Sequence, residues 1–373
     1  MTLRERILAV YRKQTPDIVP FMLDLSHFYY HKNKIPWDLS KSYTEPEYGL
    51  IDYHKKNGIG FYLNPIGCGY SVKYNGNVIA ETKKETRNNE TIITWRYETP
   101  LGAISRKRIW EENSYSWGIK EWPIENGKDL RILAYALSNR TFEPKWDDYQ
   151  KWVDYVGEQG VVYMPIGYSG IGYLLCLWMG IEKTMYAIAD MPGTIEEFVE
   201  KVNESNLRLI DLLAESPAEI IIGGDNISAD IQPPHFFEKW SKKFYTEAAK
   251  RLHKKGKFFA IHVDGRLKGA LKMTSETGAD CADAVTPAPM GDLTPHECRK
   301  EAGNDYILSG GVPPDLWLSD VDVSIFKKAV MDWLALKKFS QRLIANAGDQ
   351  VPPFADEDRI SIMRDLVEKY GKY

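Results

Sequence analysis

The stretch Gly256-Lys-Phe-Phe-Ala-Ile-His262-Val263-Asp264-Gly265 carries a histidine and a carboxylate at the end of an apolar run. The run is rich in β-forming residues and a glycine follows it, which predicts a strand over Lys257 to Val263. Side chains two residues apart lie on the same face of a strand. His262 and Asp264 are therefore expected to reach one ligand, where they can transfer a proton or hold a cation. A histidine at a strand end can also be purely structural. Whether His262 is functional therefore depends on which residues the other strands carry at their ends.

Similar short apolar segments recur along the chain, and helical patterns follow most of them. Alternation of this kind is typical of a parallel sheet, and its even spacing favours an α/β fold of the TIM (β/α)8 barrel type. The 373 residues are expected to form a single catalytic barrel domain over residues 1–373. The further predicted strands are Ile18 to Leu25, Val161 to Ile166, Glu219 to Gly223, Cys281 to Val285, Tyr306 to Leu308 and Arg342 to Ala345; the predicted helices include Ile195 to Ala214, Pro234 to His253, Val323 to Lys338 and Asp356 to Lys369.

Residues 59 to 125 interrupt the alternation of strand and helix patterns. They contain strand patterns joined by turn sequences such as Asn75-Gly76, which predicts a small antiparallel β-rich insertion near the N-terminus. Two roles are open for it: a lid or docking surface over the barrel mouth, or a cap without a part in the chemistry.

Composition limits the partners of the chain. With 48 basic and 52 acidic side chains and a net charge of -4, nucleic acid is not an expected partner. The longest uncharged apolar stretch, Gly170 to Gly180, is too short to span a membrane, and the N-terminus is unlike a signal peptide. A cytoplasmic protein is expected, and a homodimer is expected from the general frequency of such assemblies.

The cysteines are scattered along the chain, which argues against a disulfide framework and against a thiolate zinc site. They are Cys68, Cys176, Cys281 and Cys298.

Polar groups gather at the predicted C-terminal ends of the strands, where a barrel has its active site. Each is an ordinary loop residue by itself, but together they favour a functional site. The candidates are Asp24, His27, Tyr168, Asp225, Asn226, His262, Asp264, Asp292, Gly310 and Asp349.

An ordered set of motifs resembles the uroporphyrinogen decarboxylase superfamily over roughly residues 150 to 373. The insertion, with its turn Thr99-Pro-Leu-Gly102, is similar to that of corrinoid-dependent methyltransferases within the superfamily. The motifs are Gly223-Gly-Asp225-Asn226, His262-Val-Asp264-Gly, Gly278-Ala-Asp280, Thr286-Pro-Ala-Pro289-Met-Gly-Asp292, Gly310-Gly311 and Lys369-Tyr-Gly371.

The decarboxylases of the superfamily carry an arginine-rich N-terminal motif that grips substrate carboxylates. Residues 21 to 30 of this chain hold acidic and aromatic residues and no arginine, so a tetrapyrrole with eight carboxylates would find no partner there. Members that alkylate thiols bind zinc through His-x-Cys and a later Cys. The matching positions are His262, Asp264 and Asp349; a zinc site without thiolates suits activation of an oxygen better than of a thiol.

The resemblance therefore implies O-demethylation, in which a methyl group moves from a methoxylated aromatic compound to the cobalt of a corrinoid carried by a partner protein. His262, Asp264 and Asp225 are the expected catalytic residues. Two alternatives stay open: a decarboxylase-like lyase acting on a smaller carboxylic acid, and a non-catalytic barrel that binds a small molecule. The expected substrate-binding residues are Asp24, His27, Tyr168, Asn226, Asp292 and Gly310.

Overall fold

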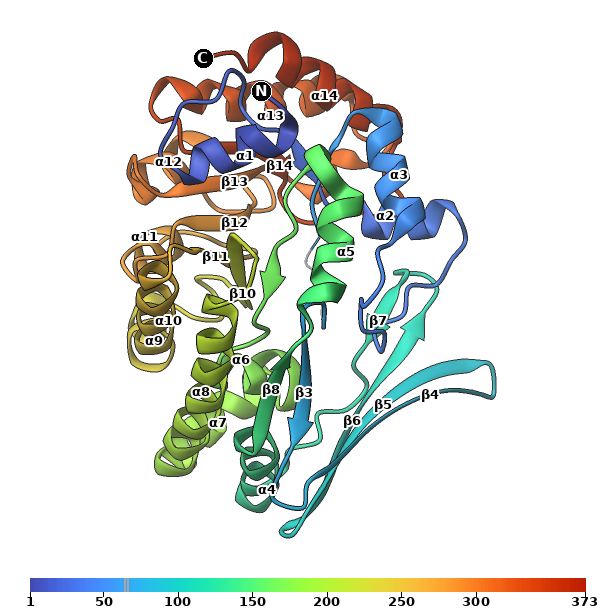
Figure 1. Ribbon diagram of the computed structural model, residues 1–373, viewed down its shortest axis with the longest axis vertical. Helices are drawn as coiled ribbons and strands as arrows, with labels where there is room; N and C mark the ends of the chain where they lie inside the picture. Colours follow the sequence, from blue (N-terminus) through green and yellow to red (C-terminus); the bar gives the residue numbers. More distant parts are fainter. Residues whose placement is uncertain (64, 66) are drawn as a thin grey trace.

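The computed structural model describes residues 1–63, 65 and 67–373, and a barrel of parallel strands forms its centre (Figure 1). Parallel bridges from Phe21 to Ala345 and from Phe61 to Gly160 join a six-stranded and a two-stranded sheet into one ring. The predicted (β/α)8 barrel is confirmed. Its strands are β1 (Met22–Leu23), β2 (Gly60–Phe61), β9 (Met164–Pro165), β10 (Ile220–Ile227), β11 (Phe258–Val263), β12 (Cys281–Val285), β13 (Ile307–Val312) and β14 (Leu343–Ala347).

Helices form the outer layer around this ring. The long predicted helix over Pro234 to His253 is broken at Ser241, whose hydroxyl donates a hydrogen bond to Gln232 at 2.6 Å. The helices are α1 (Leu3–Tyr11), α2 (Ser26–Lys32), α3 (Tyr48–Asn57), α4 (Gly127–Ser138), α5 (Trp146–Val156), α6 (Gly170–Gly172), α7 (Ile181–Asp190), α8 (Pro192–Ala214), α9 (Pro234–Trp240), α10 (Lys242–Lys254), α11 (Ala270–Ser275), α12 (Pro295–Ala302), α13 (Val323–Leu334) and α14 (Asp358–Tyr370).

Helix α1 closes the N-terminal end of the barrel. Its Tyr11 packs against Tyr163 with ring centroids 6.3 Å apart, and the two hydroxyl groups lie 3.1 Å from each other. Ile222, Ala260 and Ile344 belong to the same buried cluster. Because apolar and aromatic side chains fill this end, the C-terminal end of the barrel is left for a ligand.

The insertion differs in extent from its prediction. Gly60 and Phe61, which lie inside the predicted range of 59 to 125, form a barrel strand parallel to Met22 and Leu23. A two-residue strand gives no readable periodicity, which is why the sequence pattern hid it. The inserted strands are β3 (Tyr70–Tyr74), β4 (Ile79–Arg87), β5 (Glu90–Thr99), β6 (Gly102–Glu111), β7 (Ser116–Gly118) and β8 (Arg140–Pro144).

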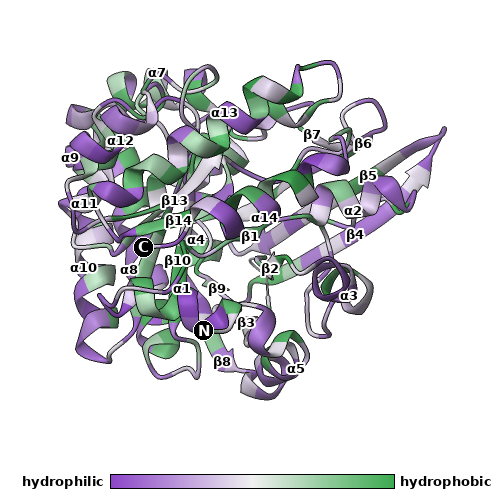
Figure 2. Cartoon of the chain, turned by 90° about the horizontal axis from the view of Figure 1, so that it is seen from above, coloured by the Kyte–Doolittle hydropathy of each residue, from purple (hydrophilic) through white to green (hydrophobic). Residues whose placement is uncertain are grey.

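Strands β4 to β7 form one antiparallel sheet, and β8 pairs with β3 beyond the predicted end at 125. Figure 2 shows the β4–β5 hairpin extending beyond the rest of the chain, with β4 largely hydrophilic. Among the described residues, no helix combines the length and apolar character that a membrane crossing requires.

Gly310 serves the closure of the barrel. A Cβ atom there would lie 2.2 Å from the Val285 carbonyl oxygen and 2.7 Å from its backbone nitrogen. Since both atoms belong to the neighbouring strand β12, a side chain would push β12 and β13 apart. The close approach of two strands explains why a glycine stands here, and its predicted contact with substrate stays a prediction.

We predict that Gly310→Ala destabilises the protein by about 2–4 kcal/mol, because backbone atoms cannot move aside as a flexible side chain can. Thermal unfolding followed by circular dichroism measures the effect. Gly193→Ala is the matched control, since no atom lies within 4 Å of the added Cβ and the position is helical. Equal unfolding midpoints for Gly310→Ala and wild type would contradict this account.

Candidate active site

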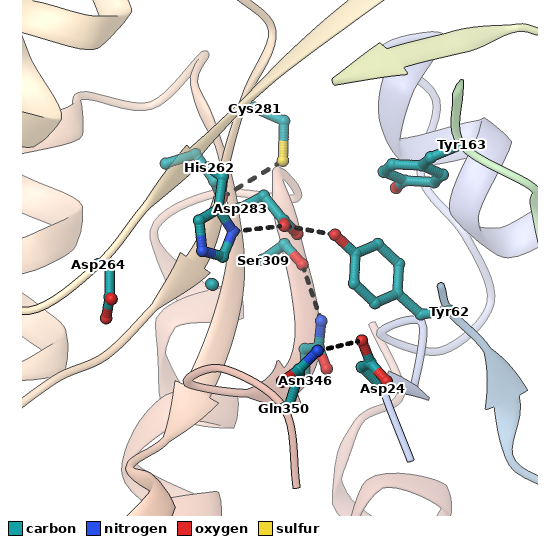
Figure 3. A network of polar contacts seen from close by, with 12 residues as sticks. Asp24, Tyr62, Tyr163, His262, Asp264, Cys281, Asp283, Ser309, Asn346 and Gln350 are labelled. Carbon is teal, nitrogen blue, oxygen red and sulfur yellow. Dashed lines mark hydrogen bonds and ion pairs between the residues drawn. The ribbon is translucent and has the colours of Figure 1, made fainter. Parts of the chain in front are cut away.

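Polar side chains enter the upper part of the barrel from six different strands or strand ends. Inward positions alternate along each strand, so the apolar layer at Ala260 and Cys281 is followed by a polar layer at His262 and Asp283. Figure 3 shows this layer, which comprises Asp24, Tyr62, His262, Asp283, Ser309 and Asn346.

The centre of the layer is a row formed by His262, Asp283 and Tyr62 (Figure 3). His262 and Asp283 are paired positions of β11 and β12, and Nδ1 of the imidazole lies 3.4 Å from Oδ2 of the carboxylate. Tyr62 donates its hydroxyl hydrogen to the same oxygen. Asp283 is 1% exposed, so a carboxylate without water is held between two donors.

This arrangement favours the protonated form of His262. Burial by itself lowers the pKa of the imidazole, but the hydrogen bond to Asp283 and the charges of Asp349, Asp283 and Asp264 outweigh it and raise the pKa to about 9. No residue that the structure describes makes a hydrogen bond to Nε2. A proton donor is therefore held in the upper barrel with one N–H group left for a ligand.

Asp264 and Asp349 influence His262 through their charges but do not join it in a coordination site. Oδ1 of Asp264 accepts a hydrogen bond from the Gly265 backbone at 2.7 Å, and Figure 3 shows this side chain apart from the row. Within the described part of the chain, no group of three His, Cys, Asp or Glu side chains could hold a metal ion. The predicted set His262, Asp264 and Asp349 does not form such a group in the described chain, and zinc binding stays a prediction. The hydrogen bond to Asp283 suits His262 to proton transfer.

Asp24 joins the polar layer as predicted. One carboxylate oxygen accepts a hydrogen bond from the Ser26 backbone at 2.9 Å, and the other lies 3.4 Å from the Gln350 amide nitrogen. Burial raises the pKa of Asp24 to about 6, with a smaller contribution from the charge of Asp349. Asp24 therefore changes its protonation state close to neutral pH.

Asp225, a predicted catalytic residue, is bound to the loop that follows β9. Its two oxygens accept hydrogen bonds from the backbone and the hydroxyl of Ser169, the former at 2.6 Å. Burial raises the pKa of Asp225 to about 6, and these hydrogen bonds oppose the shift. The side chain thus anchors the loop between β9 and α6, and no hydrogen bond links it to His262 in the described chain.

The remaining predicted residues lie in a helix, a strand and loops. His27 packs on Trp37 with centroids 5.0 Å apart, and burial lowers its pKa to about 4, so it is neutral. The rings of Tyr168 and Tyr173 have centroids 6.3 Å apart, and Asn226 is the residue before the last of β10, with a φ of 49°.

Asp292 is exposed and accepts hydrogen bonds from the backbone of Leu267 and Lys268 at 2.7 and 3.2 Å. These contacts fix the loop that follows β11, so Asp292 shapes the site through that loop.

The sequence argument missed Asp283 and Tyr62. A carboxylate in the middle of the apolar run Cys281-Ala-Asp283-Ala-Val285 was a usable signal, because buried acids need partners. Tyr62 follows a strand too short to recognise, so nothing in the sequence placed it in the barrel.

We predict that Asp283→Asn destabilises the protein more at pH 6.5 than at pH 9.5. The folded-state pKa of His262 lies above its usual value of 6.5. Its protonation therefore stabilises the fold fully below pH 6.5, and this contribution is lost as the pH rises through 9. Linkage puts it at roughly 2–3 kcal/mol near neutral pH.

Thermal unfolding at the two pH values measures this difference. Asp264→Asn is the control, because it removes a charge near His262 but no hydrogen bond to the ring. A penalty for Asp283→Asn that does not change with pH would refute the coupling.

Comparison with known proteins places this site in a family. Residues 171–370 match the family described as uroporphyrinogen decarboxylase (URO-D). A solved methyltransferase from Methanosarcina mazei has a similar fold, with a TM-score of 0.64 at 14% identity over 99% of both chains.

Two further solved structures are more distant. The IOLI protein with a bound zinc atom has a TM-score of 0.35 at 12% identity, covering 61% of this chain and 82% of its own. D-psicose 3-epimerase with D-fructose has a TM-score of 0.31 at 10% identity, covering 60% and 81%. No curated protein matches. Since the family match spans more than half of the sequence, the chain belongs to the uroporphyrinogen decarboxylase family.

Proposed function

We propose that this protein is a methyltransferase that removes the methyl group of a methoxylated aromatic compound and passes it to a corrinoid on a partner protein. The observation that carries the proposal is the pairing of His262 with the buried Asp283, which leaves Nε2 free of hydrogen bonds to the described chain. This pairing raises the pKa of His262 to about 9 and so favours its protonated form. An acid in this position suits a reaction whose leaving group is a poor one until it is protonated.

Cleavage of an aryl methyl ether has this requirement. The leaving oxygen belongs to a phenol whose pKa is about 10, as for tyrosine, so it leaves far better as the neutral phenol. The partner's reduced corrinoid is the second substrate and supplies the nucleophile that accepts the methyl group. His262 donates the Nε2 proton to the ether oxygen as the bond between that oxygen and the methyl carbon breaks.

The neighbours of His262 adapt it to this task. Asp283 holds the Nδ1–H group, which fixes the orientation of the ring and stabilises the imidazolium. Tyr62 holds Asp283 from the other side, so the carboxylate cannot turn away. Asp24, with a pKa of about 6, is suited to orient a ring substituent or to return a proton to the site.

The negative charges around His262 argue against a tetrapyrrole substrate. Asp264, Asp283 and Asp349 act on His262 through their charges, and a substrate with many carboxylates would be repelled by them. A lyase acting on a small acid stays the first alternative, and release of carbon dioxide distinguishes it. A barrel that only binds its ligand is the second, and the lack of any turnover distinguishes it.

We predict that His262→Gln lowers the rate of methyl transfer by at least about 100-fold, because general acid catalysis contributes about that much or more. The assay mixes the protein with reduced corrinoid protein and a panel of methoxylated aromatic compounds, and follows methylation of the cobalt by visible absorption. His296→Gln is the matched control, since that side chain is exposed on α12.

Absence of any methylation with wild-type protein and every donor in the panel would refute the proposed function. An unchanged rate for His262→Gln would leave methyl transfer standing but remove His262 as its acid.

A further inference from the structure

The inner face of the inserted sheet carries two arginines beside aromatic side chains. In the register of β5 and β6, Trp95 pairs with Arg106 and Ile93 pairs with Arg108. Paired residues of neighbouring strands point to the same side of a sheet, and Arg106 and Arg108 are two residues apart, so all four lie on one face.

This face meets the loop that leaves the C-terminal end of β9. Tyr97 stacks on Trp178 with centroids 5.7 Å apart. The Arg106 guanidinium lies 4.3 Å from the Trp95 ring and 5.5 Å from the Trp178 ring. Because Trp178 belongs to the segment after α6, the inserted sheet lies over the rim of the barrel, as Figure 1 also shows from the side.

Neither arginine has an acidic partner in the described part of the chain. The Arg106 guanidinium makes no hydrogen bond there, and its Nε is buried without an acceptor. Arg108 makes one, donating to the Trp117 carbonyl at 3.0 Å. On the opposite face of the same sheet, Arg96 pairs with Glu98 at 2.6 Å. A buried N–H group without an acceptor is costly, and a guanidinium without an acidic partner attracts anions. Arg106, with its unpartnered Nε, and Arg108, with one carbonyl acceptor, are therefore suited to bind an anion from outside the chain.

We call Arg106 and Arg108 the arginine roof, and Asp264 and Asp349, whose charges act on His262, the acidic floor of the site. Electrostatic interactions connect the two. The pKa of Cys176 is raised to about 12 by burial and by Asp225 and Asp264, while Arg108 opposes the rise. Asp264 also acts on the pKa of His262. Cys176 therefore lies within electrostatic range of both the roof and the floor, which have opposite charge.

We propose that Arg106 and Arg108 bind the carboxylate of the methyl donor, so that the donor is a methoxylated aromatic acid and not a neutral methoxyarene. This inference rests on the proposed function. A carboxylate is attracted by the arginine roof and repelled by Asp264 and Asp349 at the floor. The acid end of the substrate is thereby kept at the roof, the ring lies among aromatic side chains, and the methoxy group is directed to His262.

Binding of small ligands in the absence of any corrinoid tests the proposal. Calorimetry compares the three methoxybenzoate isomers with the matching methoxybenzamides, which have the same shape but no charge. The wild-type protein is expected to bind one acid at least tenfold more tightly than its amide. Arg106→Met and Arg108→Met should each weaken binding of that acid at least tenfold and change binding of the amide less than twofold.

Two further variants keep the test decisive. Lys107→Met removes an exposed cation from the opposite face of β6 and should change neither affinity. If Arg106→Met fails to fold, Arg106→Lys is used instead. This variant retains the charge and should keep the preference for the acid.

Equal affinity for acid and amide, or binding of neither, overturns the carboxylate subsite. A preference for the acid that depends on the arginines, in a protein that transfers no methyl group, supports the subsite and refutes the proposed function instead.

Discussion

The site depends on one buried carboxylate. Asp283 lies inside the barrel wall, accepts from Tyr62, and keeps His262 protonated across β11 and β12. A buried acid is unfavourable unless donors offset its burial, and here Oδ2 of Asp283 receives one donor from β11 and one from the residue after β2. Closure of the barrel, which brings β2 opposite β12, is therefore a requirement for the chemistry as well as for the fold.

The two ends of the barrel divide the tasks of stability and function. Tyr11, Tyr163 and the residues around them fill the lower lumen without room for a ligand. One step further along the strands, the inward positions are polar. The same alternation that makes Ala260 part of the core thus makes His262 part of the site. The inserted sheet adds cationic and aromatic groups, and the proposed carboxylate subsite uses them to orient the substrate.

Much of this was readable in the sequence, and the exceptions have physical reasons. Strands such as β11 show continuous apolar runs, whereas the two-residue strand β2 exists through its pairing with β1, far away in the chain. His262 could be found because it ends a run. Asp283 could be placed beside it only with the β11–β12 register, and Arg106 could be placed over the site only once the insertion was seen to reach Trp178.

The titration of the His262 imidazole by nuclear magnetic resonance tests the central claim most directly, with His262→Gln used to assign its signals. The account predicts that His262 stays protonated through pH 7.5 and loses its proton near pH 9, and that Asp283→Asn moves this midpoint towards the usual histidine value of 6.5. A wild-type midpoint at or below 6.5 would contradict the claim that the site holds a ready proton donor.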